Sequence, residues 1–137
     1  MEKPSFLFVD QNPVWLAALR RASRDLPGPK HFAGSAEEAL DLVRAHQPAV
    51  VVSGYGLPEG DGLSLLEQVS EQYPRVACVL HTARPARLLR GARGIALVEK
   101  GSAPRMLEAA LSALWVALTG TAPSLHERRG REDVTFS

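Results

Sequence analysis

The stretch VVVSGYGLPEGDG, residues 50–62, contains the pattern that decides the fold. It starts with three consecutive valines, a β-branched run without polar alternation, which is typical of a strand buried on both faces of a parallel sheet. The glycines and the proline that follow predict a loop. Apolar residues at helical spacing then begin at Leu63, so the segment predicts a strand, a loop and a helix of an α/β fold.

The same alternation continues on both sides of this segment. Four more short segments are predicted as strands: residues 5–9, 31–33, 76–80 and 95–98. Right-handed crossovers between parallel strands place helices on both faces of such a sheet. The order therefore predicts a doubly wound, five-stranded parallel sheet with helices on both faces, a three-layer sandwich.

Start signals predict where the helices begin. Asn12 is an N-cap candidate before a helix that we expect to continue to Leu26 and to stop at Pro27. The expected core positions of this helix are Val14, Leu16, Ala17, Leu19 and Leu26. Ser35 and Glu38 have the spacing of a capping box, in which each side chain accepts a hydrogen bond from the other residue's amide.

Two further helices are expected near the C-terminus. A short Arg-rich helix is predicted at residues 85–90, and a longer one after Ser102 that passes through Trp115. Residues 1–119 then form one domain. Residues 120–137 show no apolar periodicity, so we expect a flexible tail there.

The composition excludes several classes of protein. The chain has 137 residues, enough for one buried core, and 16 basic against 15 acidic residues give a net charge of +1. Near-neutrality argues against a nucleic-acid binder, and the single cysteine, Cys78, excludes an internal disulfide. No signal peptide is visible and no apolar run reaches the roughly 18 residues that span a bilayer, so we expect a cytoplasmic protein without membrane contact.

In doubly wound folds, functional residues collect beyond the carboxyl ends of the strands. The residues at those positions are Asp10, Gln11, Ser53, Gly54, Thr82 and Lys100.

These residues and the order of the elements resemble the receiver domain of two-component response regulators, a CheY-like family with a flavodoxin-like fold. The resemblance spans residues 6–118. Its matching features are Val9-Asp10 before a proline-started helix, Leu57-Pro58 and Asp61-Gly62 in the loop after the third strand, Thr82-Ala83, and Lys100. The resemblance implies phosphorelay signalling. In the family, an aspartate ending the third strand and an acidic pair after the first hold Mg²⁺, and that aspartate accepts a phosphoryl group.

The sequence departs from this pattern at its centre. Counting back four positions from Pro58, where the family has its acceptor aspartate, gives Gly54, and Gln11 stands where the second acidic residue is expected. Glycine supplies neither a nucleophile nor a metal ligand, and an amide oxygen binds Mg²⁺ more weakly than a carboxylate. We therefore expect a vestigial receiver site, with no catalytic residue, no cofactor, and Mg²⁺ binding lost or weak. For Asp10 and Lys100 we expect a salt bridge.

Two hydroxyl groups beside Gly54 are weak candidates for a replacement acceptor. A one-residue shift along a strand turns Ser53 to the opposite face of the sheet. Tyr55 lies in the loop, where no base is apparent. Cys78 is expected to be a buried small hydrophobe, and the four histidines show no ligand spacing, so core or surface roles are preferred to zinc binding.

The partner surface is expected on the Arg-rich side. Arg84, Arg87 and Arg90 share a face if they are helical. A solvated charged face is the simpler interpretation, and an acidic protein partner is the alternative. In the family, this region forms the output and dimer surface, so Leu97 and Trp115 are added as partner-binding candidates.

The functional prediction is a pseudo-receiver of bacterial signalling. It is not an enzyme, and it acts by phosphorylation-independent binding of a protein partner, with a second copy of the chain as one option. The alternative is a small-ligand or anion sensor that uses the cleft between Asp10, Gly54 and Lys100.

Overall fold

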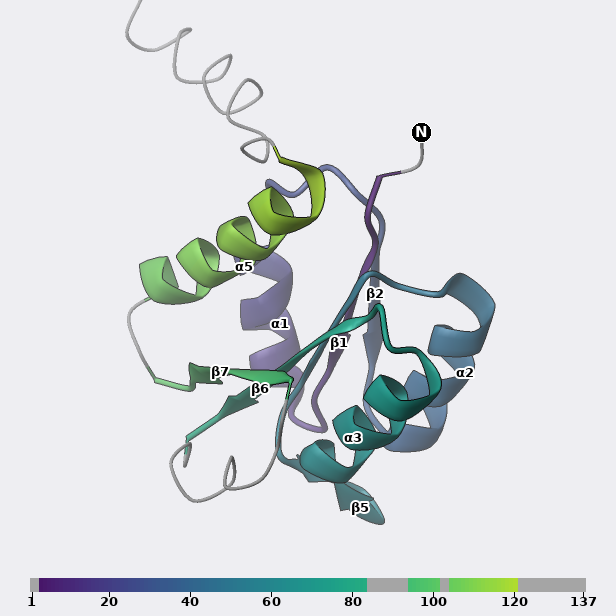
Figure 1. The fold of residues 1–137 in the computed structure, drawn as a ribbon. Coiled ribbons are helices and arrows are strands. Elements are labelled where there is room, and N and C mark those ends of the chain that lie inside the picture. Colours follow the sequence, from purple (N-terminus) through teal and green to yellow (C-terminus); the bar gives the residue numbers. More distant parts are fainter. Residues whose placement is uncertain (1–2, 84–93, 102–103, 121–137) are drawn as a thin grey trace, which may run out of the picture.

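A computed structural model describes residues 3–83, 94–101 and 104–120 of the chain, and its core is a five-stranded parallel sheet (Figure 1). The strands lie in the order β2-β1-β3-β6-β7. Their bounds are Phe6–Val9 for β1, Lys30–Ala33 for β2, Val50–Ser53 for β3, Ala77–Thr82 for β6 and Ile95–Glu99 for β7. This arrangement confirms the predicted doubly wound sheet. Beyond β3, the short strands β4 (Gly56–Leu57) and β5 (Gly60–Asp61) form an antiparallel pair within the predicted loop.

Four described helices complete the sandwich. They are α1 (Pro13–Ala22), α2 (Ala36–His46), α3 (Gly62–Gln72) and α5 (Pro104–Thr119). Figure 1 shows α1 and α5 together on one face of the sheet and α2 and α3 on the other. The Arg-rich helix predicted at residues 85–90 lies outside the described residues. None of the described helices is long and apolar enough to cross a membrane.

The helix starts follow from their caps. Asn12 accepts a hydrogen bond from the amide of Val14 at 2.9 Å, and Ser35 accepts one from the amide of Glu38 at 3.1 Å, as predicted. The reciprocal bond of the capping box differs from the prediction. The carboxylate of Glu38 accepts from the amide of Gly34 at 2.7 Å, one residue before Ser35, because the chain turns toward the helix there.

Two predictions about the first helix were wrong. The helix ends at Ala22, four residues before Leu26, because Ser23 starts a turn in which the amide of Leu26 donates to the carbonyl of Ser23. Leu26 is nevertheless buried, through that turn rather than through the helix. Val14 is 69% exposed, because the first turn of the helix directs it away from the sheet.

The two faces of the sheet are packed by different side chains. We call the side covered by α2 and α3 the aliphatic face, because leucine and valine dominate it. Its fully buried residues include Leu7, Val43, Val51, Leu66, Val69 and Leu80. The side covered by α1 and α5 is the aromatic face, where Phe6 stacks on Phe8 at 6.0 Å and on Trp115 at 6.4 Å between ring centroids.

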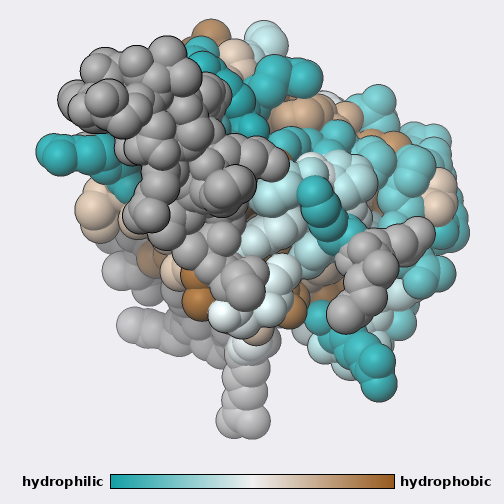
Figure 2. Space-filling view, turned by 90° about the horizontal axis from the view of Figure 1, so that it is seen from above, coloured by the Kyte–Doolittle hydropathy of each residue, from teal (hydrophilic) through white to brown (hydrophobic). Residues whose placement is uncertain are grey.

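The end of the molecule at which the strands begin is seen in Figure 2. Hydrophobic residues form small patches there among hydrophilic and neutral ones over the described surface in view. This view therefore shows no large apolar surface on the described part of that end, and the polar strand-end residues lie at the opposite end, where the strands finish.

Candidate functional site

The side chains at the carboxyl ends of four strands project toward the aromatic face. Side chains alternate along a strand, so Asp10 continues the row of Phe6 and Phe8, and Gly54 continues that of Val50 and Val52. By the same alternation, His81 follows Val79, and Lys100 follows Val98. The sheet register thus brings one carboxylate, one imidazole and one ammonium group around a glycine.

An ion pair between Asp10 and Lys100 occupies the centre of this site. The Nζ atom of Lys100 lies 2.8 Å from Oδ2 of Asp10, whose side chain is 2% exposed. The other carboxylate oxygen accepts a hydrogen bond from the amide of Asn12 at 2.9 Å. The predicted salt bridge is confirmed. A buried carboxylate is costly without such partners, so the pair holds both strand ends in place.

Because Gly54 has no side chain, the Asp10–Lys100 pair can occupy the space beside it. A Cβ atom at position 54 would lie 2.5 Å from Oδ2 of Asp10 and 3.3 Å from Nζ of Lys100. The first distance is shorter than the van der Waals contact distance between a carbon and an oxygen atom. The Asp10 carboxylate therefore fills the space that a side chain at position 54 would enter, and an anion bound in this cleft would have to displace it.

Gln11 and Thr82 lie beside the ion pair rather than in it. Gln11 is exposed, and its amide nitrogen lies along the loop, 3.4 Å from where a Cβ of Gly56 would stand. Thr82 is buried, and the alternation along β6 places its side chain on the aliphatic face. Its carbonyl accepts a hydrogen bond from the amide of Lys100 at 2.8 Å. Thr82 thus positions the backbone of the lysine.

Two aromatic side chains that sequence reasoning did not place in the site lie against it. His81 is 2% exposed and packs edge-on under Trp15 at 5.4 Å between ring centroids. Nζ of Lys100 lies 5.1 Å from the centre of the Trp15 ring, within cation–π range. Extending the strand alternation from Val79 to residue 81 would have revealed His81, but the predicted strand ended at Leu80.

Burial sets the protonation state of His81. Burial and, to a smaller extent, the nearby Lys100 ammonium lower the pKa of the imidazole, the Asp10 carboxylate opposes both effects, and the net pKa is about 4. His81 is therefore neutral at pH 7.

Comparison with known proteins identifies the family to which this fold belongs. No family model matches the sequence. The signal receiver domain of an HD domain-containing protein from Pseudomonas fluorescens Pf-5 is 30% identical and superposes with a TM-score of 0.73, over 80% of this chain and 92% of that one. The chain belongs to the receiver domain family of two-component response regulators.

Other receiver domains share the fold at lower identity. A CheY-like receiver domain protein from Methanospirillum hungatei JF-1 is 19% identical, with a TM-score of 0.73 over 83% of this chain and 94% of that one. The receiver domain of NarL from Mycobacterium tuberculosis is 24% identical, with a TM-score of 0.69 over 84% and 98%. Among curated proteins, the transcriptional regulator NtrC of Proteus hauseri is 40% identical over 48 residues, which is 35% of this chain and only 10% of that regulator.

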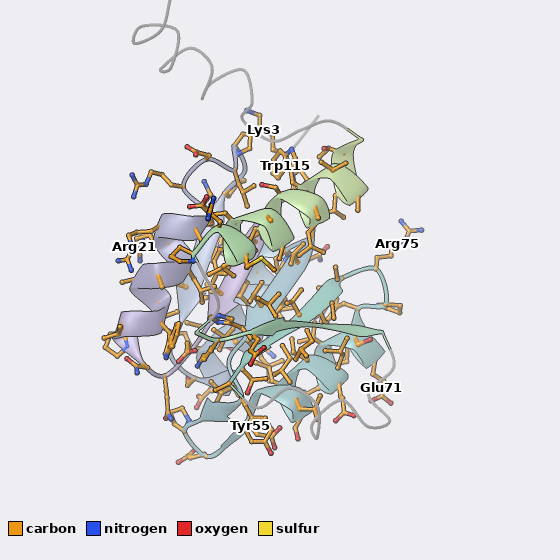
Figure 3. The ribbon with its side chains drawn as sticks, turned by 90° about the vertical axis from the view of Figure 1, so that its left-hand side faces the viewer. Lys3, Arg21, Tyr55, Glu71, Arg75 and Trp115 are labelled. Atoms are coloured by element: carbon orange, nitrogen blue, oxygen red, sulfur yellow. The ribbon has the colours of Figure 1, made fainter. Side chains whose placement is uncertain are left out.

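The two hydroxyl groups beside Gly54 lie apart from the ion pair of this receiver domain. Ser53 is fully buried on the aliphatic side, and its hydroxyl donates to the carbonyl of Gly54 at 2.9 Å. Tyr55 is 38% exposed, and Figure 3 shows it at the opposite end of the molecule from Trp115. The predicted orientation of Ser53 is confirmed.

Of the partner-binding candidates, Trp115 lies in the core of the described structure. It is 4% exposed, because α5 directs it into the aromatic core against Phe6, so its side chain does not offer a surface to a partner. Leu97 is half-buried against the aliphatic core. Arg84, Arg87 and Arg90 lie outside the described residues.

The remaining histidines and the cysteine do not form a metal centre in the part of the chain that the structure describes, where no three His, Cys, Asp or Glu side chains cluster. His31 and His46, which the sequence places on separate elements, do stack at 4.0 Å between ring centroids. Burial, together with the neighbouring His46, lowers the pKa of His31. Cys78 is buried as predicted, and burial raises the pKa of its thiol to about 11, which leaves it protonated and unreactive.

Proposed function

We propose that this receiver domain signals by binding a protein partner without accepting a phosphoryl group on an aspartate. Receiver domains of response regulators interact with partner proteins, and nothing in this proposal requires a change of that role. What differs is the event that controls partner binding, which on this proposal is not phosphorylation of an aspartate. On this proposal the domain is a pseudo-receiver and not an enzyme, and its partner binding is independent of phosphodonors.

The observation that carries the proposal is the Asp10–Lys100 pair at 2.8 Å in the space beside Gly54. Phosphoryl transfer to a carboxylate needs a nucleophilic oxygen in line with the donor and a cation that neutralises it. Position 54 offers no side-chain oxygen, and the buried Asp10 carboxylate is already paired with an ammonium group and accepts a hydrogen bond from an amide.

The residues present do not fit a Mg²⁺ ion. Mg²⁺ prefers octahedral oxygen ligands, usually with one or two carboxylates. Here Asp10 is paired with Lys100, and Gln11 lies along the loop beside Gly56.

Intact-mass measurement after incubation with a small phosphodonor and Mg²⁺ tests the trigger. An ordinary receiver domain in the same tube is the positive control, and we expect it alone to gain the mass of a phosphoryl group. An acid-sensitive adduct on this chain, whether on Asp10 or on Tyr55, would falsify the proposal.

Partner capture tests the surface. A pull-down from source cells is expected to retain its partner equally with and without phosphodonor, and to lose it when Arg84, Arg87 and Arg90 are replaced by glutamate. The matched control replaces the exposed Arg44 and Arg75 by glutamate, on other elements of the fold. If the triple variant keeps every partner, the Arg-rich side is not the binding surface. If phosphodonor changes the partners captured, the trigger is not the one proposed.

A further inference from the structure

A cavity of about 350 Å³ lies between α1 and α5, next to the Asp10–Lys100 pair. Its volume is within the range of about 300–1,000 Å³ typical of small-molecule sites. It is bounded by α1, by the ends of β6 and β7, and by the start of α5. The cavity thus lies where α1 and α5 meet the ends of β6 and β7.

The interior of the cavity favours a planar, apolar group. Trp15 and Leu107 contribute an indole ring and an isobutyl group, and Ala18 and Ala22 contribute only methyl groups, which leaves the space between the helices open. His81 is almost fully buried and packs edge-on against Trp15, so it supports that indole ring from inside the core without adding a charge at pH 7. Aromatic ligands gain from edge-to-face and offset contacts with such rings.

The two sides of the cavity differ in charge. Arg21 and Arg24 line it at the end of α1, and Figure 3 shows Arg21 on the outer surface of that helix. Asp25 follows them. Glu99 and Glu108 line it from β7 and α5. A molecule that spans the opening therefore meets two arginines and one aspartate on the α1 side and two glutamates on the side of β7 and α5.

We propose that this cavity binds a small zwitterion with an aromatic body, of the class of aromatic α-amino acids. The ring lies against Trp15, the carboxylate faces Arg21 and Arg24, and the ammonium group faces Glu108. The site does not use Gly54, so it stands whether or not the domain accepts a phosphoryl group. Its occupant would contact Trp15 and the strand ends that hold the Asp10–Lys100 pair.

Titration with three related probes, followed by amide NMR shifts, tests the chemistry. The probes are L-tryptophan, indole-3-acetate, which lacks the ammonium group, and tryptamine, which lacks the carboxylate. L-tryptophan is expected to bind tightest, by roughly threefold to fivefold over either analogue, because exposed charges contribute modestly. The largest shifts are expected at Ala18, Ala22 and Leu107. Equal affinity for all three probes, shifts located elsewhere, or no saturable shift with any of them would overturn the proposal.

Two variants with a matched control locate the site. Ala18→Leu fills the cavity and is expected to abolish saturable binding, whereas Val14→Leu changes an exposed position on the same helix and is expected to leave it intact. Glu108→Lys lies on the surface and is expected to weaken L-tryptophan and tryptamine while sparing indole-3-acetate. Unchanged L-tryptophan affinity in both Ala18→Leu and Glu108→Lys contradicts the assignment.

Discussion

The two faces of the sheet use the same strands for different purposes. On the aliphatic face, leucine and valine from α2, α3 and the strands close into a core whose buried polar groups, such as Ser53 and Thr82, lie at the strand ends. On the aromatic face, the same strands end in Asp10, His81 and Lys100, and a cavity opens between α1 and α5. The comparison teaches that both faces are closely packed, whereas the Asp10–Lys100 pair and the cavity lie on the aromatic face.

The largest expected effect concerns the core of the aliphatic face. Leu66→Ala removes a side chain with 0% exposure on α3 and should lower the free energy of unfolding by about 4 kcal/mol, because the rigid core cannot collapse onto the space. Leu63→Ala, at a half-buried position on the same helix, should cost clearly less. Urea unfolding at pH 7 measures both, and equal losses would contradict the view of this face as a tightly closed core.

The next largest effect is expected for the Asp10–Lys100 ion pair, on the aromatic face. Lys100→Met leaves Asp10 buried without its cation and should lower the free energy of unfolding by about 3 kcal/mol. Adding Asp10→Asn to that variant removes the uncompensated charge and should restore part of the loss. If the double variant is less stable than Lys100→Met, the charge is not the cause.

Lowering the pH should destabilise the folded protein through His81, which lies on the aromatic face. The unfolded imidazole takes up a proton below its ordinary pKa of 6.5, whereas burial keeps the folded pKa at about 4. The unfolded state therefore binds more protons between these values, so stability is full above pH 6.5 and falls by up to about 3 kcal/mol as the pH drops to 4. His81→Phe should lose this component, so wild type and variant should converge in stability on acidification. A difference that stays constant from pH 7 to pH 4 would show that His81 is not held neutral.

Position 54 gives the smallest expected effect. Gly54→Ala places a methyl group 2.5 Å from Oδ2 of Asp10 and should cost about 2 kcal/mol, because the ion pair has to shift. Gly60→Ala is the matched control, since a Cβ there meets nothing within 4 Å, and it should be neutral. Thermal unfolding of both variants gives the comparison, and a neutral Gly54→Ala would mean that the pair moves freely.

The fold was predictable because it depends on periodicity, whereas parts of the site depend on register. Unbroken apolar runs such as Val50-Val51-Val52 identify buried strands without any tertiary knowledge, and the strand ends then locate Asp10, Gly54 and Lys100. The Asp10–Lys100 pair follows from two such ends. The contact between His81 and Trp15 was not predicted, because it depends on where β6 ends and on which side of α1 faces the sheet. Neither can be read from the apolar pattern of the sequence.

The prediction that Val14 is buried on α1 failed for a related reason. Val14 fits an amphipathic pattern, but only the docking angle of the helix decides which members of its apolar stripe face the sheet. That angle depends on long-range contacts, which the pattern of a single helix does not contain.

The close approach of Asp10 to Gly54 also limits which side chains position 54 can accept on its own. A single replacement that places a carboxylate there enters a space already held by Asp10 and its lysine, and it brings two acidic groups close together. An acidic side chain at position 54 therefore calls for an accompanying replacement at Asp10 or Lys100, so the glycine and the ion pair have to change together.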